Sequence, residues 1–104
     1  MVPEGFETEE QLESGVTERT QEPPMYRVLL HNDDYTSMEF VVEVLMYVFG
    51  KSAEEATQIM LNVHRQGIGV CGVFTREIAE TKVETVHSLA REREFPLKSS
   101  MEKV

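Results

Sequence analysis

The sequence predicts an α+β fold in which a small three-stranded antiparallel sheet carries three helices packed on one face. Three observations predict it. Short β-rich runs alternate with segments of helical periodicity, in the order β-α-α-β-α-β. Helix start signals, in which Ser or Thr is followed three residues later by Glu, precede the first two helical segments. The length of 104 residues suits a single domain.

The charge is distributed unevenly between the two ends of the chain. Residues 1–24 contain seven Glu and one Arg, giving −6 of the formal net charge of −9, and only five scattered apolar side chains. Such a segment cannot bury enough surface to offset its ordering entropy. We therefore expect residues 1–24 to be a flexible, disordered acidic N-terminal extension and residues 25–104 to be the folded domain.

The first strand and the first helix are predicted on either side of a polar turn. Residues 25–30 are short and β-rich, and the sequence HNDD at 31–34 ends this strand with turn-forming residues. Thr36 and Glu39 have the spacing of a capping box, so the first helix is expected to begin near Thr36. Gly50 suits its C-terminal cap.

The second helix is predicted from a second capping box. Ser52 and Glu55 form this box, and the helix is expected to end near Gly67. The run that follows, residues 68–74, is β-rich although two glycines interrupt it, which predicts a second strand.

The third helix and the last strand complete the expected fold. Thr75 is the expected N-cap of the third helix, and Pro96 prevents its continuation. Residues 97–102 can form a final strand at an edge of the sheet.

Composition excludes several classes of function. The acidic balance offers no basic stripe for nucleic acid and little attraction to anionic membranes. No apolar run approaches the roughly 20 residues of a membrane-spanning helix, and the N-terminus lacks the features of a secretory signal. A single cysteine, Cys71, excludes an intrachain disulfide. We expect a cytoplasmic protein with no membrane and no nucleic-acid partner.

The acidic turn Asn32-Asp33-Asp34 has two interpretations. Its carboxylates can simply precede a helix N-terminus, where negative charge is favoured. Alternatively, they form a cluster of acceptors for a cation such as an ammonium group. The alternating ligands, glycine and distant glutamate of a calcium loop are absent, so no metal site is expected.

Histidine, cysteine and methionine side chains leave similar alternatives. His64 shares a helical face with Met60, where it is either a structural side chain or a partner for a bound group. Met38, Met46 and Met60 can fill the core or line an adaptable pocket. Cys71 lies in an apolar run, and nothing beside it marks a nucleophile site.

Four motifs in the same order resemble those of one family. Residues 26–41, YRVLLHNDDYTSMEFV, resemble the signature of the ClpS adaptors, which centres on NDDYT-x-MEFV. Three further segments agree, at residues 56–64, 69–75 and 77–83, and so do the closing residues 96–97 and 101–103. The resemblance covers roughly residues 23–103 in one register.

The resemblance implies a non-enzymatic adaptor without a cofactor. ClpS-like proteins bind the N-terminal segment of N-end-rule substrates and deliver them to the N-domain of a ClpA- or ClpC-type ATPase, which works with the ClpP peptidase. By matching positions, the residues that bind the α-amino group are Asn32, Asp33, Asp34 and His64. The hydrophobic pocket for the first side chain, which is Leu, Phe, Tyr or Trp, is implied to consist of Thr36, Met38, Val41, Met60, Val63 and Leu97. Met38 corresponds to a gatekeeper against β-branched side chains, and Glu77 and Lys82 to contacts with the ATPase.

Several positions depart from the family pattern, among them Ser37, His31, Phe95 and residues 98–100, and two other functions compete with the adaptor. Ser37 replaces a frequent proline, and His31 replaces an aliphatic residue that is expected beside the pocket. An N-degron recognition module of a ubiquitin-ligase-type system is one alternative, although nothing in this short chain recruits a ubiquitin-conjugating partner. A small hydrolase using His64 and an aspartate is the other, and no nucleophile or oxyanion motif supports it.

Overall fold

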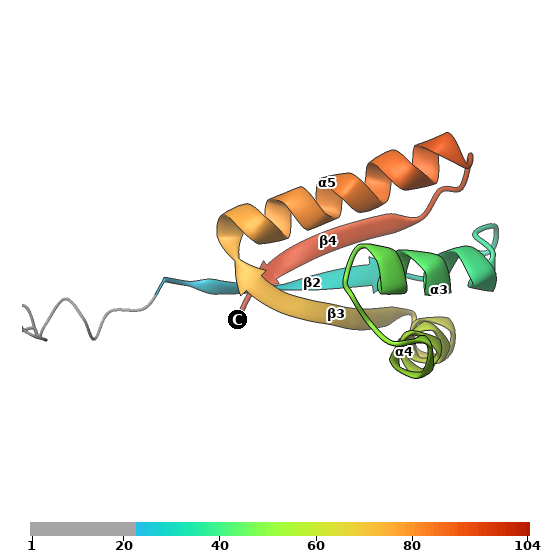
Figure 1. Cartoon of the computed structure of the whole chain (residues 1–104), viewed down its shortest axis with the longest axis horizontal. Helices are drawn as coiled ribbons and strands as arrows, with labels where there is room; N and C mark the ends of the chain where they lie inside the picture. The colour runs from blue at the N-terminus through green and yellow to red at the C-terminus, as the bar shows by residue number, and fades with distance from the viewer. Residues whose placement is uncertain (1–22) are drawn as a thin grey trace, which may run out of the picture.

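The computed structural model describes residues 23–104, and its elements follow the predicted order (Figure 1). The strands and helices are β2 (Met25–His31), α3 (Met38–Tyr47), α4 (Ala53–Gln66), β3 (Ile68–Thr75), α5 (Arg76–Glu92) and β4 (Lys98–Lys103). The predicted acidic extension, apart from Pro23 and Pro24, lies outside the described residues.

The three strands form one antiparallel sheet in the order β3-β2-β4, so the predicted last strand is indeed an edge strand. The register pairs Leu30 with Gly69 on one side and with Ser99 on the other. A bulge between Val28 and Leu29 leaves Cys71 as the extra residue of β3. Cys71 consequently turns into the core, where it is 1% exposed.

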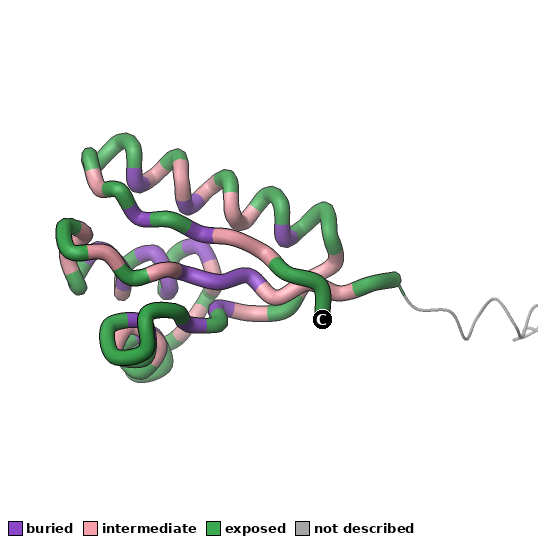
Figure 2. The backbone as a smooth tube through the Cα atoms, turned by 180° about the vertical axis from the view of Figure 1, so that it is seen from behind, coloured by how far each residue is buried: buried purple, intermediate pink, exposed green. Residues whose placement is uncertain are grey.

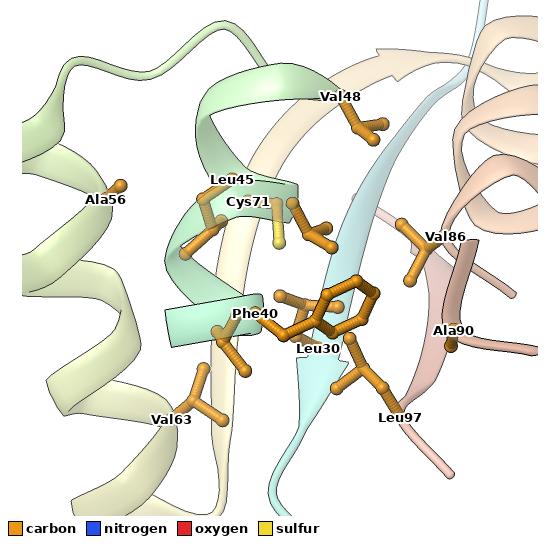
Figure 3. Close-up of a cluster of buried hydrophobic side chains, with 12 residues drawn as sticks. Leu30, Phe40, Leu45, Val48, Ala56, Val63, Cys71, Val86, Ala90 and Leu97 are labelled. Atoms are coloured by element: carbon orange, nitrogen blue, oxygen red, sulfur yellow. The ribbon is translucent and has the colours of Figure 1, made fainter. Parts of the chain in front are cut away.

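A single apolar core joins the sheet to all three helices. The buried cluster draws side chains from every helix and from the strands, among them Leu30, Leu45, Val63, Val86 and Ala90 (Figure 3). Because one cluster contains all three helices, they lie on the same face of the sheet, as predicted. Seen from behind, the described strands have no helix crossing in front of them (Figure 2).

Two details of the helix ends differ from the predictions. Ser37, not Thr36, is the N-cap of α3, and its side-chain oxygen accepts a hydrogen bond from the Phe40 N–H at 3.1 Å. The predicted capping box at Thr36 is wrong because the Thr36 hydroxyl donates a hydrogen bond to the Asp33 carboxylate instead. At the other end, Val48 is the C-cap, and Gly50 lies beyond it in a left-handed conformation with φ of 65°.

The ends of α4 were predicted correctly, whereas the start of α5 is only partly as expected. Ser52 and Glu55 make the reciprocal hydrogen bonds of a capping box at 3.1 Å each. Gly67 ends α4 with φ of 88°, a conformation that favours glycine. Thr75 is the N-cap of α5, but its side chain makes no capping hydrogen bond.

Burial makes the only cysteine chemically inert. Desolvation raises the pKa of the Cys71 thiol to about 12, although the positive charge of Lys51 acts in the opposite direction. The thiol is therefore neutral at physiological pH, which excludes a nucleophilic role in this folded state.

We expect Cys71 to resist alkylation by iodoacetamide in the native protein and to react once the chain is unfolded. Mass spectrometry after timed alkylation, with and without urea, measures the difference. Because the thiol lies in the core, the native rate should follow the population of unfolded molecules. Rapid native labelling at pH 7 would contradict this assignment.

Candidate functional site

The acidic turn is attached to the end of α4 by a backbone hydrogen bond. The Asn32 N–H donates to the Gly67 carbonyl at 3.0 Å, while the Gly67 N–H donates to the Val63 carbonyl at 2.9 Å. The left-handed Gly67 thus ends the helix and aims its own carbonyl at the turn. His64, one turn before this cap, is thereby held at the same end of the molecule as Asn32.

Close packing of β3 against α4 sets how near that helix lies to the strand. A Cβ atom added at Gly69 would lie 2.6 Å from Cγ2 of Val63, so only glycine permits this approach. Val63 is 3% exposed and lines both the core and the candidate pocket. Gly69, which interrupts the β-rich run in the sequence, therefore allows Val63 to lie where it forms part of the pocket wall.

Asp33 organises the turn from inside. Its Oδ1 accepts from the backbone N–H groups of Tyr35 at 2.8 Å and Thr36 at 2.7 Å, and its Oδ2 accepts from the Thr36 hydroxyl at 2.7 Å. Burial alone would raise the pKa of Asp33, but these three hydrogen bonds outweigh it and lower the pKa below its ordinary value. The Asp33 carboxylate is therefore ionised at neutral pH, and most of its acceptor capacity is used by hydrogen bonds within the turn.

Asp34 and Asn32 are placed differently from Asp33. Both side chains are exposed at the hollow, and none of the hydrogen bonds found in the described part of the chain involves either side chain. Their oxygens are consequently free to accept from a cationic ligand. The acidic turn thus combines one carboxylate that shapes the loop with one that faces outward.

The turn and two helices enclose a hollow of about 210 Å³. It is smaller than the roughly 300–1,000 Å³ of most small-molecule sites, which suits one side chain and its amino group. Nine of the ten side chains expected at the amine and pocket sites line it, namely Asn32, Asp33, Asp34, Thr36, Met38, Val41, Met60, Val63 and His64. Polar groups lie at the turn, and α3 and α4 supply the apolar wall.

Two other residues lie elsewhere than the sequence suggested. Leu97 is 4% exposed and belongs to the core cluster with Phe40 and Ala90, outside the residues that line the hollow. It precedes β4 and packs beneath the helices, so it supports the site indirectly. His31 was expected beside the pocket, but its Nε2 lies 2.6 Å from the Ser100 hydroxyl. Strand alternation places His31 on the opposite face of the sheet from Leu30, so its ring points away from the pocket.

Glu77 and Lys82 lie on α5, and both line a separate depression together with Tyr47 and Ile78. The Lys82 ammonium group donates to the Val48 carbonyl at 2.7 Å, so it caps the end of α3. Sequence reasoning missed this capping role, because the two residues are 34 positions apart and only the fold brings them together.

A larger apolar groove, of about 570 Å³, lies between α3 and α5. Most of its lining is apolar, and the Glu43 carboxylate at its edge is already paired with Arg93, so we assign the candidate ligand site to the smaller hollow, where the acidic turn meets the apolar wall. Within residues 23–104, no group of three or more His, Cys, Asp or Glu side chains is arranged to hold a metal ion. None of the described helices has the length and apolar character needed to cross a membrane.

Comparison with known proteins gives consistent results. A family model described as "ATP-dependent Clp protease adaptor protein ClpS" matches residues 21–100. The chain is 68% identical over 90 residues to the ATP-dependent Clp protease adapter protein ClpS of Desulforapulum autotrophicum, covering 86% of each chain. It is 66% identical over 86 residues to the ClpS of Desulfatibacillum aliphaticivorans, covering 83% of each.

A solved structure agrees with the fold. The chain is similar to Agrobacterium tumefaciens ClpS2 bound to L-phenylalaninamide, with a TM-score of 0.78 and 42% sequence identity. The match covers 80% of this chain and 100% of that one. The bound compound in that structure combines a free α-amino group with a bulky apolar side chain.

Proposed function

The chain belongs to the ClpS family of ATP-dependent Clp protease adaptors, and from this premise we propose that it is an N-end-rule adaptor. It binds the free α-amino group and the bulky hydrophobic N-terminal residue of a substrate, and delivers that substrate to a ClpA- or ClpC-type ATPase for proteolysis by the partner peptidase ClpP. The observation that carries the proposal is the hollow in which an acidic turn meets an apolar helical wall.

The polar end of the hollow suits an ammonium group. Asp34 and Asn32 present free oxygens, and a neutral His64 ring can accept a third hydrogen bond. Asp33 adds a negative charge that its loop hydrogen bonds keep ionised. In this assignment Asp33 shapes the turn, and Asp34 with Asn32 and His64 contacts the amine.

The apolar end accepts the first side chain of the substrate. Val41 and Val63 are buried, Met60 is half-buried and Met38 is 47% exposed at the mouth. Burying a Leu or Phe side chain contributes about 1.5–3 kcal/mol. Each hydrogen bond to the charged amine contributes about 1.5–3 kcal/mol. Two or three such bonds and the side chain, less ordering costs, reach the roughly −8 kcal/mol of micromolar binding.

Delivery is tested by degradation of a reporter. A fluorescent protein with an N-terminal Leu, incubated with the ATPase and peptidase of the same organism, should be degraded several-fold faster when the chain is added. The same reporter with an N-terminal Ala serves as the control, since Ala leaves the pocket unfilled. Equal degradation of the Leu reporter with and without the chain would contradict the delivery function.

Met38→Ala should relax the discrimination against β-branched residues. Met38 stands at the mouth of the hollow, and its truncation widens the entrance next to Cβ of the first residue. We expect the preference for Leu over Val or Ile peptides to fall by about tenfold, since a methylene-sized difference in fit is worth about 1–3 kcal/mol. Fluorescence anisotropy with Leu and Val peptides measures it. Met46→Ala, on the same helix but outside this hollow, should leave the preference unchanged.

A further inference from the structure

The apolar wall of the hollow at the acidic turn becomes more buried from its mouth to its base. Met38 is 47% exposed and Met60 is half-buried, whereas Val41 is 7% and Val63 3% exposed. Val63 projects from α4 toward the core (Figure 3). The two buried valines therefore form the closed end, where the tip of a long substrate side chain would arrive. The position of Val63 consequently limits the size of the first residue that fits.

Gly69 of β3 contacts Val63 from behind this wall. A Cβ atom added at Gly69 would lie 2.6 Å from Cγ2 of Val63 and 3.5 Å from the carbonyl oxygen of Ile59. Carbon atoms in contact are about 3.5–4.0 Å apart, so such a methyl group requires a movement of about 1 Å. Gly69 is buried, and neither it nor any other residue of β3 lines the hollow. Any effect of Gly69 on a ligand therefore passes through Val63.

The strand is not free to make that movement. Gly69 pairs with Leu30 of β2, which is the central strand and is hydrogen-bonded to β4 on its other side. Leu30 is completely buried in the core. Moving β3 away from α4 would disturb both this pairing and the core packing, so the adjustment has to occur on the helix.

The backbone of α4 is also held in place beside Val63. The Val63 carbonyl accepts from the Gly67 N–H at 2.9 Å, and the Gly67 carbonyl accepts from the Asn32 N–H at 3.0 Å. These bonds tie the end of the helix to the acidic turn. Valine in a helix also has one strongly preferred χ1 rotamer, so rotation of its side chain is unfavourable. A methyl group at Gly69 therefore pushes the Val63 side chain away from β3 and into the hollow.

We propose that Gly69 is a specificity-determining residue of the pocket, because its lack of a side chain keeps the base of the hollow deep enough for an aromatic first residue. Gly69 acts as a positioning residue for Val63 and does not touch the ligand itself. The inference rests on the proposed function and deepens it. It names the substrate class, aromatic N-terminal residues, whose binding depends on this contact behind the pocket.

The test is the binding of Gly69→Ala, in the full chain, to two peptides that differ only in an N-terminal Phe or Leu. Fluorescence anisotropy gives both affinities. We expect the affinity for the Phe peptide to fall by about tenfold relative to that for the Leu peptide, the effect of about one methyl group in an apolar pocket. The ring of Phe extends farther from its Cα than the methyl groups of Leu, so it meets the displaced Val63 first.

Gly72→Ala is the matched control, since it makes the same substitution in the same strand. A Cβ atom at Gly72 would lie 2.7 Å from Cζ of Phe74, a comparably close contact, and neither residue lines the hollow. Thermal unfolding of both variants measures the cost to stability. Gly72→Ala should lower the stability but leave the ratio of Phe to Leu affinity at the wild-type value.

A rescue variant separates a change in pocket depth from general damage. Val63→Ala removes Cγ2 and deepens the base, so it should raise the ratio of Phe to Leu affinity. Adding Gly69→Ala to it places a methyl group in the space that Cγ2 vacates and should return the ratio toward the wild-type value. An additive loss of affinity for both peptides in the double variant would contradict this compensation.

An unchanged ratio of Phe to Leu affinity in Gly69→Ala would overturn the proposal, while normal binding of both peptides by the wild-type chain would leave the proposed function intact. If the wild-type chain binds neither peptide, the proposed function fails and this inference fails with it. If Gly69→Ala does not fold, the double variant decides, because Val63→Ala relieves the close contact. Equal ratios in Val63→Ala and the double variant would then overturn the proposal.

Discussion

A peptide whose N-terminal leucine is acetylated should bind at least about 100-fold more weakly than the same peptide with a free α-amino group. Acetylation removes the positive charge and two of the three N–H donors that would meet Asp34, Asn32 and His64. Losing two charge-assisted hydrogen bonds removes about 3–6 kcal/mol, and each 1.4 kcal/mol is a factor of ten. Fluorescence anisotropy with the two labelled peptides gives the ratio directly.

The control for this comparison is the same pair of peptides with alanine in place of leucine. Neither alanine peptide should bind measurably at micromolar concentrations, because the apolar wall then remains unfilled. If the free and acetylated leucine peptides bound equally well, the acidic turn would have no role in recognition and the proposed mode of binding would be untenable.

Asp33→Ala should reduce the affinity for a Leu peptide by about 10–100-fold, even though Asp33 is assigned to the loop and not to the ligand. The substitution removes three hydrogen bonds that fix the backbone between Asp33 and Thr36. Each such bond is worth about 0.5–1.5 kcal/mol or somewhat more to a charged acceptor. The turn then loses the geometry that presents Asn32 and Asp34.

Glu39→Ala is the matched control, since it removes the same charge from an exposed position in the first turn of α3. Isothermal titration calorimetry compares the two variants, and amide chemical shifts of residues 32–36 report whether the turn has moved. Normal affinity in Asp33→Ala would show that the turn does not depend on its internal hydrogen bonds.

The order of helices and strands could be predicted because it depends on local patterns in the sequence. The capping box at Ser52 and the left-handed Gly67 are short-range signals, and both correspond to the ends of α4 in the structure. The apolar residues of the helices and of the strands likewise repeat with the period of each kind of element. These features depend on neighbours in sequence, and for that reason sequence analysis identified them.

The errors arose where two local signals competed. Thr36 and Ser37 both qualify as caps, and the outcome depends on Asp33, which binds the Thr36 hydroxyl and leaves the Ser37 side chain to accept from the Phe40 N–H. A capping pattern alone cannot rank two adjacent hydroxyls. Asp33, which decides between them, lies three residues before Thr36 and is not part of the capping pattern.

Other features depended on strand register, which a single sequence leaves open. His31 bonds to Ser100, and Leu97 packs in the core, because β2 pairs with β4 in one particular register. A shift of one residue would exchange the two faces of β4. The capping of α3 by Lys82 depends on the same long-range packing.

Most of the predicted site residues come together in the structure, although they come from separate segments of the sequence. Asn32, Asp34, Met38, Met60 and His64 come from three segments, and the structure brings them around one hollow. The sequence could not show that the two carboxylates of the acidic turn have different roles. Asp33 and Asp34 have the same side chain, and only their hydrogen-bond partners distinguish the carboxylate that forms the loop from the one that is left free at the hollow.

The most direct test of the account is a crystal structure of the chain with L-phenylalaninamide. We predict that the amino nitrogen lies within hydrogen-bond distance of Asp34 and His64, and that the phenyl ring lies between Met38 and Met60. A ligand bound instead in the larger groove between α3 and α5, with the hollow at the acidic turn empty, would contradict it.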